Sequence, residues 1–526
     1  MHFSFLLTIV GVFIVHVITC KDPSVLASSS VHRVLQRSIN TTVHFRVHLD
    51  RSPQSPFHHY WKTSVGSGHA SLCLHTTWRE HVLKAKQELG FTGIRFHGIF
   101  SDDMSVVLGP GDDDQKPYYY SFFNVFNCFD FLLHSGIRPV VEIGFMPELF
   151  ASNASQTVFH WKGIVSPPKR YDLWDDLITS FGNALVQRYG IKEVSNWVFE
   201  VWNEPNLRNG FWYGSKEEYF ELYRHTALAL KRAHKELRVG GPVTAFAEWI
   251  PEFIQFTKSN NVPLNFISTH QYPTDEFPVL RDFLWQNVKK TKSIVVDHYK
   301  LPLYYTEWNA GLQDGRGSHI YQDSAYPAAY IVKALFELYS QVELFSFWCV
   351  SDIFEEGGQQ SLPFSGTYGL ITNNGIRKPV WRAFELIGQS GDYLIEVEKV
   401  SIPSLKNSTV DAYATVNSKT GELVVFVTNW QIPGLPQMTY DVSVSFSNSL
   451  VDACTLTIID ETHSNAFTRW QQLNKPIYPT IQQIYDLQKS SELIPQSLKV
   501  NSDGTITIPT PILSPSLHVI RCVKAK

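Results

Sequence analysis

Two glutamates follow short apolar runs, and their setting predicts a pair of catalytic carboxyl groups. The run Trp197–Val201 has the composition of a buried strand and leads into the tripeptide Asn-Glu-Pro, which contains Glu204. Because proline has no N–H group and a fixed φ, the strand must end at this tripeptide. A second run, Leu303–Thr306, leads directly into Glu307. One carboxyl group that donates a proton and one that attacks as a nucleophile are the requirements for hydrolysing a glycosidic bond with retention of configuration.

Apolar runs and helical patterns alternate between residues 60 and 391, and this alternation predicts the fold that positions the two glutamates. The expected strands are Thr63–Ser67, Gly93–His97, Arg138–Ile143, Trp197–Val201, Arg238–Pro242, Leu264–Thr269, Leu303–Thr306 and Leu344–Trp348. Helical patterns lie between them, for example Thr77–Leu89, Lys216–Leu237 and Pro327–Ser340. Such a β-then-α repeat indicates an α/β protein with a (β/α)8 TIM barrel, whose catalytic groups lie at the carboxyl ends of the strands. An open doubly wound sheet is the alternative, but no Gly-x-Gly-x-x-Gly loop follows the first strand.

The chain changes character after residue 391. Val, Thr, Ile and Phe dominate the runs Gly421–Trp430, Asp441–Phe446, Thr455–Ile459 and Thr505–Ile508, and Thr480–Leu487 is the main helical pattern. We therefore predict an accessory C-terminal β-sandwich domain over residues 392–526. In the N-terminal segment 21–59, the run Thr41–Leu49 alternates like a strand, and we expect it to join the same sandwich.

The start of the chain predicts entry into the secretory pathway. Phe3–Thr19 is an apolar run without a charged side chain. We interpret residues 1–20 as a signal peptide, and an uncleaved signal anchor is the alternative. Candidate N-glycosylation sites are Asn40, Asn153 and Asn407, each of which begins an Asn-x-Ser/Thr sequon. These features predict a secreted or lysosomal protein with no stable membrane anchor after cleavage.

Composition excludes some partners and leaves the cysteines sparse. The net charge of −4 at pH 7, without a basic stripe, argues against nucleic acid as a partner. After loss of Cys20 an odd number of cysteines remains. Cys454 and Cys522 are the disulfide candidates because both lie in β-rich sequence. Cys349 is expected to be a buried free thiol. No His-Glu-x-x-His motif or Cys/His cluster occurs, so we predict neither a metal nor a cofactor. Aromatic residues, at 14%, fit either sugar stacking or a large aromatic core.

Several stretches together resemble glycoside hydrolase family 39. They are Arg95–Asp103, Glu142–Pro147, Val201–Leu207, Thr306–Asn309, Phe347–Glu356 and Ile459–Asn465. The resemblance covers nearly the whole chain after the signal peptide. It implies a barrel glycosidase whose acid/base and nucleophile end the fourth and seventh strands, which would be Glu204 and Glu307.

The same resemblance implies roles for residues near the other strand ends. Asn203 would bind the sugar 2-hydroxyl, Tyr272 would hydrogen-bond the nucleophile, and Trp348 would form the floor of the sugar pocket. Substrate binding is further expected from His97, His270 and Glu356, although Glu355 could face the pocket instead of Glu356. The two histidines and Trp348 could also be ordinary core residues.

Two activities and one non-enzymatic role remain open on the sequence. The family includes β-D-xylosidases, which act on neutral pentosides, and α-L-iduronidases, which act on glycosaminoglycans and must bind a uronate carboxylate. Arginine suits that task through bidentate pairing, but Leu362–Asn374, after the eighth strand, contains no Arg or Lys. We therefore favour a β-xylosidase-like retaining exo-glycosidase, with iduronidase as the alternative and a non-catalytic carbohydrate-binding protein as the alternative of another class.

Overall fold

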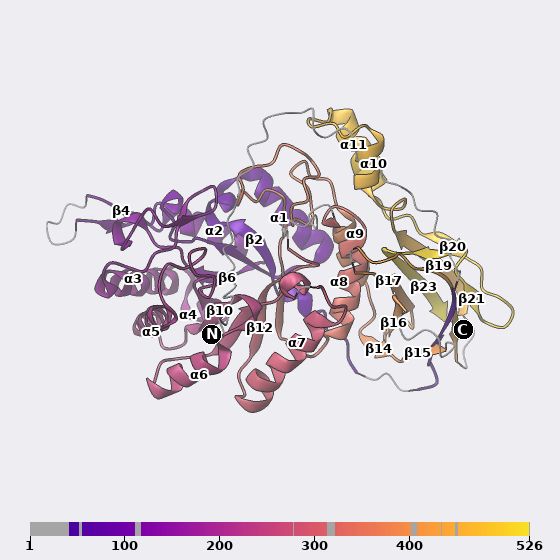
Figure 1. The fold of residues 1–526 in the computed structure, drawn as a ribbon, viewed down its shortest axis with the longest axis horizontal. Coiled ribbons are helices and arrows are strands. Elements are labelled where there is room, and N and C mark those ends of the chain that lie inside the picture. The colour runs from indigo at the N-terminus through magenta and orange to yellow at the C-terminus, as the bar shows by residue number, and fades with distance from the viewer. Residues whose placement is uncertain are drawn as a thin grey trace, which may run out of the picture. The chain divides into compact units, whose positions relative to one another are not determined.

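A closed barrel of parallel strands forms the first part of the molecule (Figure 1). In this computed structural model the described residues are 41–51, 55–110, 117–276, 278–312, 321–400, 408–432, 434–447 and 451–524. The predicted signal peptide and the candidate glycosylation sites Asn40 and Asn407 lie outside them. The barrel strands are β2 (Val65–His69), β3 (Gly93–His97), β6 (Arg138–Ile143), β9 (Val198–Val201), β10 (Arg238–Thr244), β11 (Phe266–His270), β12 (Leu303–Trp308) and β13 (Leu344–Phe347). Because β13 pairs with β2, the sheet closes, which confirms the TIM barrel and excludes the open sheet.

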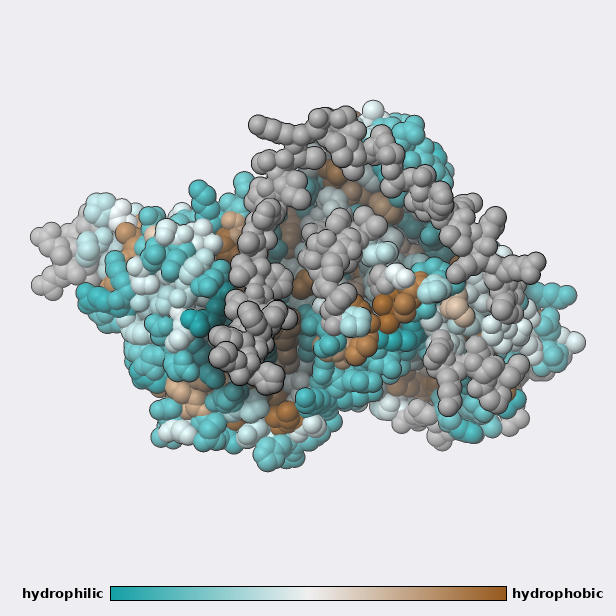
Figure 2. All heavy atoms as spheres, viewed as in Figure 1, coloured by the Kyte–Doolittle hydropathy of each residue, from teal (hydrophilic) through white to brown (hydrophobic). Residues whose placement is uncertain are grey.

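Helices cover the outside of the barrel (Figure 1). They are α1 (Thr76–Leu89), α2 (Phe123–His134), α3 (Tyr171–Tyr189), α4 (Ile191–Val194), α5 (Lys216–Ala233), α6 (Ile250–Ser259), α7 (Phe283–Lys292), α8 (Tyr326–Glu337) and α9 (Pro379–Ile387). Figure 2 shows mainly hydrophilic residues over α3, α5 and α6, as expected for helices that bury only one side. No helix within the described ranges is long and apolar enough to cross a membrane.

Some strands and helices begin or end at other residues than expected, because local hydrogen bonds set their ends. Thr63, expected to start the first strand, instead ends a 3-10 turn because its Oγ1 donates to the carbonyl of Tyr60 at 2.7 Å. The strand therefore runs from Val65 to His69 and carries His69 to its carboxyl end. Helix α5 begins at a capping box between Ser215 and Glu218 and stops at Ala233, earlier than expected, since the next residue is extended.

Two sheets make up the C-terminal region. One contains β15 (Val397–Val400), β1 (Thr41–Val47), β18 (Thr439–Phe446), β21 (Ile506–Thr507) and β22 (Ile512–Leu513). The other has the order β14 (Tyr393–Ile395), β16 (Val410–Val416), β17 (Leu423–Asn429), β23 (Ser516–Lys524), β19 (Val451–Ile459) and β20 (Gln496–Leu498). Strand β1 comes from the N-terminal segment, runs parallel to β18 and antiparallel to β15, and so joins the two ends of the chain. Cys454 and Cys522, which face each other on β19 and β23, form a disulfide.

Two features of the fold were not expected from sequence, one in the C-terminal region and one in the barrel. Helix α10 (Ala466–Gln472) precedes α11 (Ile481–Ser490), and its N-terminus is capped by the Asn465 side chain, which accepts from Phe467 N and Thr468 N. In the barrel, Cys73 and Cys128 form a second disulfide, which ties the segment before α1 to α2. Cys349 is a free buried cysteine.

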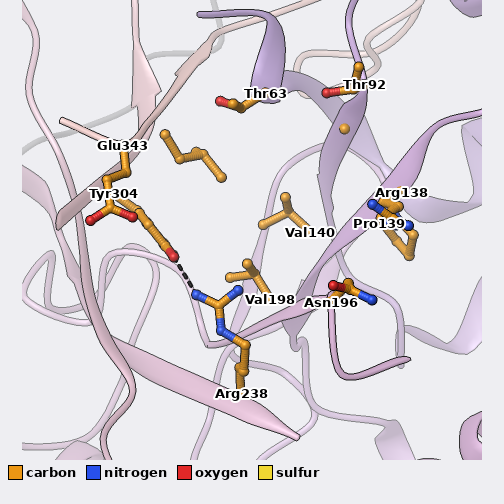
Figure 3. A pocket seen from close by; sticks show the side chains of 12 residues that line it. Thr63, Thr92, Arg138, Pro139, Val140, Asn196, Val198, Arg238, Tyr304 and Glu343 are labelled. Atoms are coloured by element: carbon orange, nitrogen blue, oxygen red, sulfur yellow. Dashed lines mark hydrogen bonds between the residues drawn. The ribbon is translucent and has the colours of Figure 1, made fainter. Parts of the chain in front are cut away.

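The barrel core closes differently at its two ends. At the amino ends of the strands lies a pocket of about 270 Å³ (Figure 3). Its floor is apolar and includes Val140 and Val198, while Arg238 at its edge donates to the Tyr304 hydroxyl. Neither Glu204 nor Glu307 lines it. In TIM barrels this face serves stability, whereas the carboxyl ends of the strands carry the chemistry.

Candidate active site

Glu204 and Glu307 meet at the carboxyl ends of the barrel strands. Glu204 lies just after β9 and Glu307 lies in β12, and their residues are only 8% and 5% exposed. A carboxylate oxygen of Glu204, a carboxylate oxygen of Glu307 and a ring nitrogen of His270 all lie within 4.8 Å of one another. Carboxyl groups about 5–5.5 Å apart suit a retaining mechanism, and inverting enzymes need about 6.5–9.5 Å to admit a water. With an oxygen of each carboxyl group within 4.8 Å of the other, the two groups are close enough to act on the same bond.

A tight turn points Glu204 into the barrel mouth. Trp202 and Glu204 have φ values of 73° and 44°, a left-handed conformation that non-glycine residues seldom adopt. The turn is held from a neighbouring strand, because Glu204 N donates to the Val243 carbonyl at 2.9 Å. Backbone strain of this kind persists only where surrounding contacts fix it, and it is common at functional sites.

The environment of Glu204 suits a proton donor. Burial raises the pKa of Glu204 from 4.5 to about 7, Arg95 opposes this rise, and the charge of Glu142 adds to it. His270 Nδ1 lies 2.9 Å from Glu204 Oε1. Burial lowers the pKa of His270 to about 4, so the imidazole is neutral near pH 7. A carboxyl group with a pKa near the working pH can both give and take a proton.

The Glu307 carboxyl group accepts hydrogen bonds from two donors. Arg95 Nη1 lies 2.6 Å from its Oε1, and the Tyr272 hydroxyl donates to its Oε2 at 2.8 Å. Burial, with the nearby Glu307 charge, raises the pKa of Tyr272 well above its usual value, so this phenol keeps its proton. With one oxygen bonded to Arg95 and the other to Tyr272, the Glu307 carboxyl group is fixed in orientation.

A fully buried ion cluster supports this arrangement from below. The Arg95 guanidinium is 2.8 Å from Glu200 Oε1 through Nε, and its Nη2 is 2.9 Å from both Glu142 Oε2 and Asn203 Oδ1. His97 Nδ1 lies 2.7 Å from the same Glu142 oxygen. Burial raises the pKa of Glu142 to about 8. The cluster links β3, β6, β9 and β12, so it fixes Glu307 and Asn203 relative to each other.

Sequence reasoning gave no role to Arg95, Glu142 or Glu200. The available signal was a charged residue inside each of three short apolar strands, since charged side chains are rarely buried unless they are paired. Which residues pair could not be read from that pattern, because their partners lie on different strands.

The other expected site residues line the same mouth. His97 lies next to both Trp348 and Glu356. Its ring centroid is 4.9 Å from that of Trp348, and its Nε2 is 4.0 Å from Glu356 Oε1 and 3.8 Å from Glu307 Oε1. Burial lowers the pKa of His97 to about 3. Burial and the charges of Glu307 and Glu204 raise the pKa of Glu356. Glu356 thus points into the site.

The Trp348 ring packs tightly against strand β2 at Gly66. A Cβ atom on Gly66 would come within 2.5 Å of the Trp348 ring, so β2 needs a glycine there. The ring is 3% exposed and also contacts Phe354 edge-on. This places an aromatic surface at the bottom of the mouth beside His97, where a sugar ring could rest.

Glu204, His270 and Glu307 together also have the composition of a metal site. The Arg95 guanidinium already lies 2.6 Å from Glu307 and supplies the positive charge there. A divalent cation in the same place would be repelled by that guanidinium. The cluster fits acid–base and nucleophilic chemistry better than metal binding.

Comparison with known proteins agrees with this geometry. The family model for glycosyl hydrolases family 39 matches residues 44–506. The chain belongs to this family. It is therefore a glycoside hydrolase. A β-xylosidase of Caldicellulosiruptor saccharolyticus is 40% identical over 82% of this chain and 88% of that protein. The solved structure of a family 39 β-xylosidase from Caulobacter crescentus is 30% identical, with a TM-score of 0.74, over 91% of this chain and 99% of that one.

Relatives with another named activity are more distant. An α-L-iduronidase of Mus musculus is 21% identical over 82% of this chain and 72% of that protein. Of the two activities that the sequence left open, the chain is thus more similar to the β-xylosidase than to the iduronidase.

Proposed function

We propose that the protein is a retaining exo-β-D-xylosidase, with Glu204 as acid/base and Glu307 as nucleophile. The observation that carries the proposal is the pairing of two buried carboxyl groups in unlike environments. Burial raises the pKa of Glu204 to about 7, while Arg95 and Tyr272 both donate to Glu307. Environments that treat two neighbouring carboxyl groups differently assign one as acid and the other as nucleophile.

The reaction proceeds by double displacement. In the first step a Glu307 oxygen attacks the anomeric carbon, Glu204 gives its proton to the glycosidic oxygen, and the leaving group departs as an alcohol. In the second step the Glu204 carboxylate takes a proton from water, the water oxygen bonds to the anomeric carbon, and Glu307 is released. Two inversions at one carbon restore the original configuration.

Residues around the pair would orient the sugar. Asn203, whose Oδ1 accepts from Arg95, presents its amide to the 2-hydroxyl. Trp348 forms the platform under the sugar ring, and His97 and Glu356 bind sugar hydroxyls. His270 orients Glu204 through its Nδ1. Hydrogen bonds to the 2-hydroxyl that strengthen in the transition state are a general source of rate in this chemistry.

The charges near the pocket favour a neutral sugar. A uronate carboxylate needs a cation, since an unpaired buried carboxylate is costly. Arg95 is engaged with Glu142, Glu200 and Glu307, and the partly exposed side chain of Glu356 adds a further carboxyl group facing the sugar. The β-xylosidase similarity supports the same choice.

The deciding experiment compares an aryl β-xyloside with an aryl α-L-iduronide on the wild type and on Arg316→Ala. Arg316 follows β12 in the sequence and lies outside the described residues, and its removal tests whether an arginine of that segment serves a uronate. Arg232→Ala on the surface is the matched control. We expect higher kcat/KM on the xyloside in all three proteins. Preference for the iduronide that is lost in Arg316→Ala would make the protein an iduronidase.

We also propose that the protein enters the secretory pathway and is secreted or lysosomal. Support comes from the apolar run Phe3–Thr19 and from the two disulfides, which persist in oxidising compartments. The sequon residue Asn153 is exposed. Expression in animal cells should give a protein whose mass falls on treatment with an N-glycan-removing enzyme, and by less for Asn153→Gln. Retention in the cytosol would refute the proposal.

A further inference from the structure

A short hairpin after β6 extends over the mouth of the barrel. Its strands are β7 (Thr157–Val158) and β8 (Gly163–Ile164), and we call residues Thr157–Ile164 the strap. At its tip Phe159 and Lys162 have φ values of 65° and 57°. Left-handed backbone at two residues that are not glycine is held only where tertiary contacts fix it. The strap must therefore be anchored by what it touches.

Its contacts reach the tops of three successive strands. Beside β3, a Cβ atom on Gly98 would lie 3.1 Å from the Trp161 ring. At the end of β2, the His69 ring stacks on Trp161 with centroids 4.3 Å apart and planes 5° from parallel. After β13, the backbone carbonyl of Glu356 accepts a hydrogen bond from His160 N at 2.7 Å. Because β6, β3, β2 and β13 are consecutive in the barrel, the strap crosses one side of the mouth.

The strap lies beside the residues expected to bind the sugar. The Phe159 ring centroid is 5.9 Å from that of His97, which itself contacts Trp348. Its anchor, Glu356, points its carboxyl group toward His97. The strap thus borders the part of the pocket formed by β3 and β13.

The acid/base lies on the opposite side. Glu204 follows β9, and its partner His270 ends β11, whereas β13 and β2 lie across the barrel from β9 and β10. The leaving group must depart past Glu204, since Glu204 gives it a proton. The bound sugar then extends from the anomeric carbon toward the β13, β2 and β3 side, and its non-reducing end meets the strap.

We propose that the strap sets the exo mode of cleavage, with Trp161 as the wall that blocks a second sugar beyond the non-reducing end. This inference rests on the proposed function. His69 Nδ1 and Trp161 Nε1 are buried atoms without a hydrogen-bond partner among the described residues. Because both atoms are shut off from solvent, the surface where Trp161 stacks on His69 is closed and leaves no passage there. A wall of this kind admits one sugar residue and no more.

The test uses 4-nitrophenyl β-xylobioside, which reports where the chain is cut. The wild type should release xylose and 4-nitrophenyl β-xyloside first, so nitrophenol appears only after a lag. Trp161→Ala should release xylobiose and nitrophenol directly, without the lag, and raise the initial rate of nitrophenol release by about tenfold or more. The control is Leu149→Ala, which trims an exposed apolar side chain on the same connection after β6. It should keep the lag.

The outcomes separate this inference from the proposed function. If a folded Trp161→Ala protein still releases xylose first with an unchanged lag, the strap does not set the exo mode, and the xylosidase proposal is untouched. If Trp161→Ala does not fold, Trp161→Leu, which keeps an apolar side chain over His69, gives the same test. If the wild type cleaves no aryl xyloside, the proposed function fails, and the lag is measured instead with the aryl diglycoside of whichever sugar the enzyme accepts.

Discussion

Replacing Glu204 by glutamine should stabilise the folded protein at neutral and higher pH, although it removes the acid/base. The reason is burial: a carboxyl group whose pKa rises from 4.5 to about 7 in the folded state ionises less readily there than in the unfolded chain. Above pH 7 the ionised group therefore favours unfolding. Glutamine keeps nearly the same shape and carries no charge.

The magnitude follows from the pKa difference. Each pKa unit corresponds to about 1.4 kcal/mol, so a rise from 4.5 to about 7 predicts a penalty on the order of 3 kcal/mol once both states are ionised. Because the pKa of Glu204 is higher in the folded state than in the unfolded chain, the protein loses stability as the pH rises. The penalty is absent below about pH 4.5, grows as the pH rises, and is complete above about pH 7. Glu204→Gln should remove it.

The assay is urea unfolding of the wild type and of Glu204→Gln at several pH values between 4.5 and 8. The difference in unfolding free energy should be near zero at the acid end and reach roughly 3 kcal/mol in favour of Glu204→Gln at pH 8. Glu236→Gln, which removes a carboxyl group on the protein surface, is the matched control and should give a flat difference. A Glu204→Gln difference that does not change with pH would refute the account of Glu204 as a buried, proton-holding acid.

Two further variants test the nucleophile and its support. Glu307→Ala should abolish turnover without loss of the fold, because no covalent intermediate can form, and a mechanism-based fluorinated glycoside should label Glu307 in the wild type when peptides are mapped. A label on another residue would make the assignment wrong. Tyr272→Phe removes the hydroxyl that lies 2.8 Å from Glu307 Oε2, and the loss of a hydrogen bond to a charged group, about 1.5–3 kcal/mol, predicts a roughly ten- to hundredfold fall in kcat. A Tyr272→Phe enzyme with wild-type kcat and a raised KM would instead indicate a role in ground-state binding only.

The barrel could be predicted because its strands are continuous apolar runs. Arg138–Ile143 and Gly93–His97 begin and end where the sequence indicated, since both are buried on each face and bounded by turn residues. The strand that ends in His69 was shifted, because a 3-10 turn closed by Thr63 competes with strand formation. A short-range hydrogen bond of this kind leaves no clear trace in hydrophobic periodicity.

One of the two disulfides could be predicted from sequence and the other could not. Cys454 and Cys522 both lie in β-rich sequence, and the structure pairs them across adjacent strands. Cys73 lies in a short 3-10 segment and Cys128 in helix α2, 55 residues away along the chain. Nothing local relates these two positions. Only the packing of that segment against α2 brings their sulfur atoms together.

The strap shows why the chemistry of this site could be predicted further than its specificity. Proton donation and nucleophilic attack require carboxyl groups at strand ends, and Glu204 and Glu307 carry that signal in their own neighbours. The strap carries no such signal: its tip uses Phe159 and Lys162 at left-handed φ values, where hairpin turns favour glycine or asparagine. Local preference is overridden there by contacts with His69 and Glu356, which lie far away in the sequence. The wall that decides how many sugars fit is therefore a product of the barrel's closure, and it can be located only after β13 and β2 are known to be neighbours.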